Sequence, residues 1–244
     1  MELENMIHGD MPGDKIDIGQ THLDKADKIY PVLREMLPDG KAVICVCGGS
    51  GVGKSEIASL LGTRLTRDGI KAYVMSGDNY PHRIPMDNDA ERERVYAEGG
   101  RPALEGYLGS PLEIDFDLVN GILRDFKAGK SPIALKRMGR TRDEIWFDDV
   151  DLSDTRVLIL EWTHGNSDYL DAVDVPILLN STPEETLAHR RARARDKGVD
   201  SPFTTMVLEI EQGQLKRQAH KARIIVTKDG DLISFEEYQA LMGE

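Results

Sequence analysis

Apolar residues recur along this 244-residue chain with two periods, which predict strands alternating with helices. Short apolar, β-branched runs predict buried strands at 41–47, 71–76, 131–135, 156–161, 175–180 and 222–226. Apolar positions three and four residues apart predict helices at 23–37, 56–65, 90–98, 114–127, 183–197, 203–218 and 235–242. Strands that alternate with helices are typical of βαβ units. The fold class we expect is therefore α/β, with a doubly wound, mostly parallel sheet.

The chain divides at about residue 40 in this interpretation. Residues 1–40 form an N-terminal helical extension, and residues 41–244 form one domain with a lid at about 187–203. The extension has two possible roles that stay open. It forms a contact between two copies in a homo-oligomer, or it covers the sheet.

The most informative motif is a glycine-rich loop between the first strand and the next helix. It matches G-x-x-x-x-G-K-[ST] at each fixed position and consists of Gly48, Gly49, Ser50, Gly51, Val52, Gly53, Lys54 and Ser55. Backbone N–H groups in such a loop, together with a helix N-terminus, bind phosphate oxygens. We expect the loop to bind ATP, with Lys54 at the β- and γ-phosphates and the Ser55 hydroxyl on Mg²⁺. The loop predicts a P-loop NTPase fold.

Carboxylates follow two of the predicted strands, where a parallel sheet gathers its ligands. Asp78 follows the second strand and is the candidate base that accepts the acceptor's hydroxyl proton. Glu161 ends the most apolar strand and is a candidate for holding Mg²⁺ or the acceptor's hydroxyls. Ser55, Asp78 and Glu161 form the expected metal site, and which carboxylate lies nearer the metal stays open. His164 is a further acceptor-binding candidate.

Two groups of cations stand out in a chain whose net charge is −12. Arg191 and Arg195 share one face of the predicted helix 183–197, and such a helix can close over ATP as a catalytic, arginine-bearing lid. The second group follows the strand at 131–135 and contains Lys136, Arg137, Arg140 and Arg142. It favours an anionic acceptor that carries a phosphate, carboxylate or sulfate, and a basic surface loop is the alternative. Near Asp78, three further acceptor candidates are Tyr80, His82 and Arg83.

The bulk composition excludes some function classes. The acidic balance argues against duplex nucleic acid as the main partner, because phosphate backbones require a basic face. The longest apolar runs are far shorter than a membrane span, and the N-terminus shows no secretory signal pattern, so we expect a cytoplasmic protein that does not enter a membrane. Cys45 and Cys47 are two residues apart on a predicted strand and are interpreted as core residues.

Taken together, these motifs resemble the phosphoribulokinase/uridine kinase family of P-loop small-molecule kinases, over about residues 41–226. Besides the phosphate loop, residues 76–80 are similar to the family's segment whose leading Asp is the catalytic base. Residues 157–161 are similar to its strand ending in Glu-Gly, and residues 189–196 to its lid helix. The resemblance implies a P-loop NTPase fold of the nucleoside- or nucleotide-kinase type, with ATP and Mg²⁺ as cofactors. It also implies transfer of the γ-phosphate to a hydroxyl of a small metabolite.

Two departures from the family pattern bear on the acceptor. Trp162 stands where the family usually has Gly, and Leu135-Lys136-Arg137 replaces the Tyr-Asp segment of uridine kinases. A sugar phosphate or a small acid is therefore the expected acceptor, with uridine as an alternative. Residues 77–83 are also similar to a Gly-Asp-Asn-x-x-His segment of adenylylsulfate kinases, whose acceptor is anionic. An alternative of another class is a nucleotide-dependent regulatory ATPase. The preference between ATP and GTP stays open.

Overall fold

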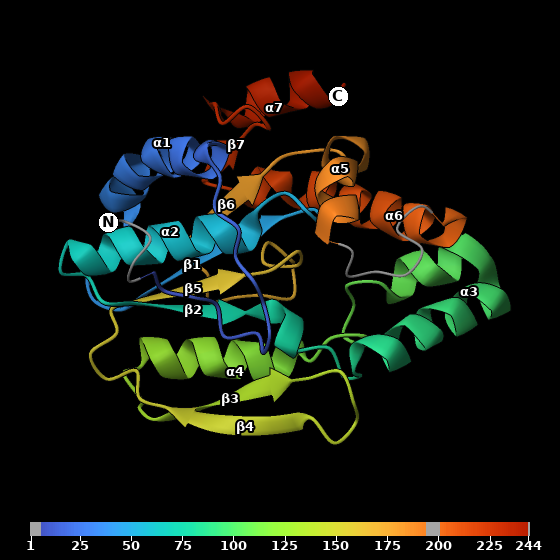
Figure 1. Ribbon diagram of the computed structural model, residues 1–244, viewed down its shortest axis with the longest axis horizontal. Coiled ribbons are helices and arrows are strands. Elements are labelled where there is room, and N and C mark those ends of the chain that lie inside the picture. The colour runs from blue at the N-terminus through green and yellow to red at the C-terminus, as the bar shows by residue number, and fades with distance from the viewer. Residues whose placement is uncertain (1–5, 194–200, 244) are drawn as a thin grey trace.

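The computed structural model describes residues 6–193 and 201–243, and a six-stranded sheet lies at their centre (Figure 1). The strand order is β2-β5-β1-β6-β7-β8, and all neighbours pair in parallel except β7 and β8. In that order the strands are β2 (Ala72–Ser76), β5 (Val157–Glu161), β1 (Ala42–Gly48), β6 (Val175–Leu179), β7 (Ile224–Val226) and β8 (Leu232–Ile233). This confirms the predicted α/β class with a mostly parallel sheet.

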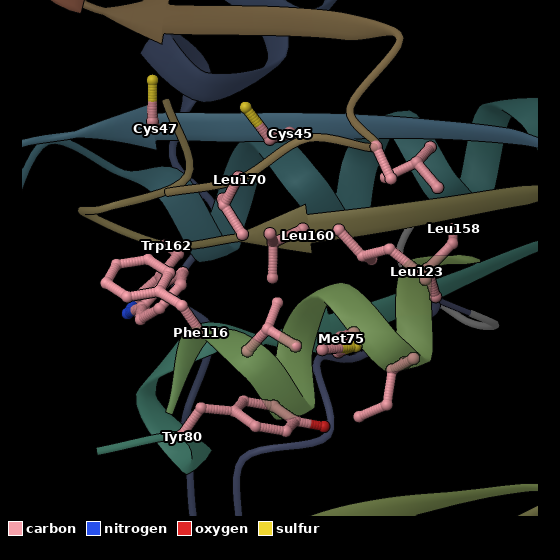
Figure 2. Close-up of a cluster of buried hydrophobic side chains, with 14 of the residues drawn as sticks. Cys45, Cys47, Met75, Tyr80, Phe116, Leu123, Leu158, Leu160, Trp162 and Leu170 are labelled. Carbon is pink, nitrogen blue, oxygen red and sulfur yellow. The ribbon is translucent and has the colours of Figure 1, made fainter. Parts of the chain in front are cut away.

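Helices cover both faces of the sheet, as the alternating side chains of β1 require. Ile44 belongs to a core cluster with apolar residues of α1 (Gln20–Met36) and α2 (Lys54–Arg67). Cys45 and Cys47 point to the opposite face and belong to the cluster of α4 (Phe116–Lys127) and α6 (Pro202–Gln218), part of which Figure 2 shows. Both cysteines are fully buried, which confirms that they are core residues.

The helix of the N-terminal extension packs against the body of the chain. Ala26, Ile29 and Leu33 lie on one face of α1 and are fully buried. They share a core cluster with residues of α2, which lies beside α1 in Figure 1. Within the described residues, the apolar face of α1 is therefore used to cover the sheet.

A two-stranded antiparallel hairpin, separate from the main sheet, is formed by β3 (Ile133–Met138) and β4 (Ile145–Val150). The sequence predicted a strand at 131–135 but none at 145–150. The reason is that β4 is exposed over its first five residues, so its apolar residues do not form a buried run. Exposed apolar residues beside aspartates do not show the period that identifies a core strand.

The remaining helices are α3 (Pro85–Tyr107), α5 (Pro183–Arg193) and α7 (Phe235–Met242), with short 3₁₀ segments η1 (Gly77–Asn79) and η2 (Ala219–Lys221). The short helix expected at 90–98 is part of α3, a longer helical segment that Gly100 interrupts with a φ of 65°. Among the helices of the described residues, none is both long and apolar enough to cross a bilayer.

Candidate active site

The glycine-rich loop joins β1 to α2, as the sequence predicted. Gly51 and Gly53 have φ angles of 78° and 96°, in the left-handed region that favours glycine. A Cβ on Gly51 would also lie 2.9 Å from the Cγ atom of Arg190. The loop ends at the N-terminus of α2, whose first N–H groups have no partner within the helix and favour an anion.

Glu161 lies at the floor of the site, between two serine hydroxyls. Ser55 Oγ donates to Glu161 Oε2 at 3.2 Å, and Ser76 Oγ donates to Glu161 Oε1 at 2.7 Å. The parallel register explains the arrangement, because β5 lies between β1 and β2 and Ser76 pairs with Glu161. Burial and, to a smaller extent, the nearby Asp78 carboxylate raise the pKa of Glu161, Lys54 opposes both effects, and the net pKa is about 8. Glu161 is thus a buried carboxyl group that a bound cation would stabilise in its charged form.

The oxygen atoms around Glu161 fit a magnesium ion. A serine hydroxyl and carboxylate oxygens are the ligands that Mg²⁺ prefers, and Mg²⁺ usually keeps several waters and substrate phosphates in its shell. In the part of the chain that the structure describes, no group of three or more His, Cys, Asp or Glu residues forms a preformed metal site. Ser55 and Glu161 would therefore hold the ion together with the nucleotide, and Asp78 would lie beside it. When bound, the ion neutralises charge on the phosphoryl oxygens.

A pocket of about 230 Å³ brings the predicted phosphate and carboxylate residues together. Its lining consists of Met11, Asp14, Ser50, Gly51, Lys54, Ser55, Ser76, Asp78, Glu161, Thr163 and Arg190. Lys54 Nζ donates to the Gly49 carbonyl at 3.1 Å, so the ammonium group lies at the phosphate loop. Asp78 is exposed on η1, where a carboxylate can reach an acceptor in the pocket.

Arg190 is the arginine of α5 that lines the pocket, whereas the sequence favoured Arg191 and Arg195. Arg190 is buried, its Nη2 donates to the Pro183 carbonyl at 2.7 Å, and its Nε has no hydrogen-bond partner among the described residues. Arg191 is exposed on the same helix, and Arg195 lies outside the described residues. The signal that would have identified Arg190 is its spacing of seven from Pro183 and four from Thr186, which puts all three on one helical face.

The four cations after the strand at 131–135 do not converge on the pocket, in contrast to our expectation. Arg137 is buried in ion pairs with Asp10 and Asp148, at 2.8 Å and 3.1 Å. Lys136 Nζ donates to a backbone carbonyl at 2.7 Å, and Arg142 forms an ion pair with Asp87 at 2.7 Å. Arg140 is exposed. The hairpin spreads these side chains over different faces, because successive residues of a strand point in opposite directions.

Three other acceptor candidates also lie outside the pocket lining. Tyr80 is fully buried in the core cluster that also contains Phe116 and Met75 (Figure 2), and burial raises the pKa of its hydroxyl. His82 Nε2 lies 3.0 Å from the carbonyl oxygen of a proline on the exposed surface. Arg83 Nη1 donates to a tyrosine hydroxyl of α3 at 3.1 Å. Their expected contact with the acceptor is not supported, because Asp78 is the last residue of this turn that lines the pocket.

Trp162, which stands where the family usually has Gly, packs against the turn that carries Asp78. Its indole lies directly over Gly77, so that a Cβ on Gly77 would be 2.0 Å from the ring. His164 packs edge-to-face against Trp162, with ring centroids 5.5 Å apart. Burial lowers the pKa of His164 to about 4, so the imidazole is neutral near pH 7. Thr163, between them, lines the pocket.

Sequence reasoning missed the contribution of the N-terminal segment to the pocket. Met11 and Asp14 belong to the lining, although residues 1–20 show no helical or strand period. No signal in this single sequence identifies them. Their place depends on a long-range path that brings the segment beside β2.

The comparisons with known proteins identify the family of the chain. The sequence profile of the Phosphoribulokinase / Uridine kinase family matches residues 43–200. The chain is 46% identical over 216 residues to the bifunctional α-galactosidase/sucrose kinase AgaSK of Mediterraneibacter gnavus, covering 87% of this chain and 23% of that protein. It is 29% identical over 93 residues to a probable adenylyl-sulfate kinase of Bacillus subtilis, covering 33% of this chain and 46% of that protein. The chain thus spans less than half the length of each of these curated relatives.

Solved structures share the fold at low sequence identity. Phosphoribulokinase from Rhodobacter spheroides superposes with a TM-score of 0.58 at 19% identity, covering 78% of this chain and 71% of that chain. A possible uridine kinase from Bacillus stearothermophilus gives a TM-score of 0.56 at 19% identity, covering 83% and 97%. The family profile spans most of the chain and includes the loop, both strand-end carboxylates and α5. The chain therefore belongs to the phosphoribulokinase/uridine kinase family, a family of ATP-dependent small-molecule kinases.

Proposed function

We propose that this protein transfers the γ-phosphate of ATP to a hydroxyl of a neutral sugar, with sucrose as the first acceptor to test. The observation that carries the proposal is the charge of the pocket lining. Among the described residues, its cations are Lys54 and Arg190, and both lie at the phosphate loop.

The acceptor side offers hydroxyl-binding groups. Besides the two cations, the ionisable side chains in the lining are Asp14, Asp78 and Glu161, and Thr163 adds a hydroxyl group. Ionised carboxylates accept hydrogen bonds from sugar hydroxyls, and a threonine hydroxyl both donates and accepts them. An anionic acceptor, which the sequence favoured, would require a cation there, but Arg137 and Arg142 are engaged in ion pairs with other aspartates. The relative with 46% identity carries sucrose kinase in its name, which supports a neutral sugar.

The site residues then take distinct roles in the transfer. Lys54, Arg190 and the loop amides would bind and orient the triphosphate, and Ser55 and Glu161 would hold Mg²⁺. Asp78 would accept the proton of the attacking hydroxyl as the new bond to phosphorus forms. Closure of α5 as a lid would exclude water, so that the phosphoryl group reaches the sugar in preference to water.

The test measures ADP release from Mg-ATP with sucrose, glucose, fructose, uridine, glycerate and adenylylsulfate, for the wild type and for Asp78→Asn. We expect stimulation by a neutral sugar and a product heavier by one phosphoryl group. The variant should lose a factor of about 10²–10⁴ in turnover, typical for a general base. Stimulation by an anionic acceptor alone would refute the neutral-sugar proposal. ATP hydrolysis that no acceptor stimulates would favour the regulatory ATPase.

A further inference from the structure

The segment before α1 runs along the outer edge of the sheet and ends at the active site. In Figure 1 its dark blue trace passes β2 before it turns back to α1. The Ile7 amide donates to Thr63 Oγ1 of α2 at 3.0 Å, and Gly9 lies close to Val74 of β2. Asp10 follows at the carboxyl end of β2, which is the end that carries Asp78.

Asp10 is hydrogen-bonded to the residues on both sides of Asp78. Asp10 Oδ1 accepts from the Ser76 amide at 2.7 Å and from Asn79 Nδ2 at 3.2 Å. Ser76 belongs to β2 and Asn79 to η1, so one carboxylate oxygen joins the strand to the turn. Asn79 Oδ1 in turn accepts from the Met138 amide at 3.0 Å, which fixes the turn to β3.

The second oxygen of Asp10 fixes the carboxylate itself. Arg137 Nη1 donates to Asp10 Oδ2 at 2.8 Å, and the Tyr73 hydroxyl donates to it at 3.1 Å. The side chains of Asp10 and Arg137 are only 7% and 8% exposed. A buried, charged acceptor whose two oxygens are both hydrogen-bonded has little freedom to rotate, so it can hold the Ser76–Asn79 turn in one conformation.

We propose that Asp10 is a positioning residue that aims the catalytic base Asp78 into the pocket. The inference rests on the proposed role of Asp78. The N-terminal segment lies outside residues 43–200, which the family profile matches. The same segment places Met11 and Asp14 in the pocket wall, which makes it part of the acceptor site as well as the support of the base.

A double-mutant cycle tests whether Asp10 acts through Asp78. Asp10→Asn removes the charge at nearly constant volume, and it is measured alone and in the Asp78→Asn background. We expect Asp10→Asn alone to lower kcat by about ten- to a hundredfold, because small misplacements of catalytic groups have effects of that size. The KM for ATP should change less than about twofold. In the Asp78→Asn background, Asp10→Asn should have no further effect on turnover.

Two further variants keep the test independent of folding. Asn79→Ala removes both side-chain hydrogen bonds of the turn, the one to Asp10 and the one from the Met138 amide, and leaves the Asp10–Arg137 ion pair intact. It should give at least the same selective loss of kcat. Thr63→Val removes the anchor of Ile7 on α2, far from the pocket, and should leave kcat within about twofold of the wild type.

The outcomes separate this inference from the proposed function. If Asp78→Asn loses turnover but Asp10→Asn lowers the remaining rate by the same factor as in the wild type, Asp10 acts elsewhere and the inference is wrong. An unchanged kcat in both Asp10→Asn and Asn79→Ala overturns it as well. Full turnover in Asp78→Asn would instead overturn the assigned base.

Discussion

In the absence of nucleotide, Glu161→Gln should remove part of the dependence of the free energy of unfolding on pH. In the folded state Glu161 keeps its proton up to about pH 8, whereas the unfolded chain releases it near pH 4.5. Between these values the folded state binds more protons than the unfolded state. The free energy of unfolding therefore falls as the pH rises through this window. Glutamine cannot ionise, so the variant lacks this contribution.

The size of the effect follows from the pKa difference and from access of water. One pKa unit corresponds to about 1.4 kcal/mol, so a rise from 4.5 to about 8 sets an upper limit of roughly 5 kcal/mol. Glu161 borders an open pocket of about 230 Å³, and water there stabilises the carboxylate. We therefore expect the variant to gain about 1–3 kcal/mol relative to the wild type between pH 5 and pH 8.5.

The assay is urea unfolding of both proteins in EDTA at pH 5, 6, 7, 8 and 8.5. The difference in the free energy of unfolding between variant and wild type should grow with pH and level off above about pH 8.

Glu113→Gln is a control for which we expect the opposite sign. Burial raises the pKa of Glu113, but Arg92 at 2.6 Å and the Gly109 amide outweigh burial and hold it below its usual range. That variant is measured also at pH 3 and 4, because the proton uptake of Glu113 lies below about pH 4.5. Relative to the wild type it should lose stability as the pH rises from 3 to 5, and the difference should stay constant above pH 5. A difference between Glu161→Gln and the wild type that is constant from pH 5 to 8.5, or that shrinks as the pH rises, would refute the reasoning.

Three further predictions concern the nucleotide side, the base turn and the N-terminal helix. Arg190→Ala should raise the KM for ATP by about tenfold, because Arg190 lines the pocket. Arg191→Ala removes an exposed side chain and should change the KM for ATP less than about twofold. Equal effects of the two variants in steady-state kinetics would contradict the assignment of Arg190. Gly77→Ala should lower kcat by at least about tenfold, because the new Cβ would displace the ring of Trp162 or the turn that carries Asp78. Unchanged turnover would show that the turn adapts. Ile29→Ala should destabilise the protein by about 2–5 kcal/mol in urea unfolding, the range for a fully buried Ile, and a loss below 1 kcal/mol would mean that α1 is dispensable as a sheet cover.

The central sheet could be predicted from the sequence because its strands are buried on both faces. The runs at β1, β5 and β6 are continuous and apolar, which is the pattern that a parallel sheet imposes. The phosphate loop and the two strand-end carboxylates followed from local motifs and from one topological rule. Both kinds of signal lie within a few consecutive residues, so a single sequence contains them.

The acceptor side could not be predicted because its geometry depends on long-range contacts. The cations near Arg137 are close in sequence but point to different partners, and the partner of Arg137 is Asp10, 127 residues away. In α5 the spacing of the arginines alone favoured Arg191 and Arg195, and the approach of Gly51 to Arg190 shows which arginine faces the loop. Sequence distance is therefore a poor guide to which charges share a pocket.

The path of the N-terminal segment also bears on how the protein behaves at high concentration. An edge strand presents unpaired backbone groups to which a second chain can add a strand, which is a common route to aggregation. Here β2 is one edge of the sheet, and the Ser76 amide on that strand is already satisfied by Asp10. The opposite edge, β8, is only two residues long. Asp10, to which we assign a positioning role, therefore also occupies one backbone donor of this edge, so a change that detaches the segment would expose that donor as well as lower turnover.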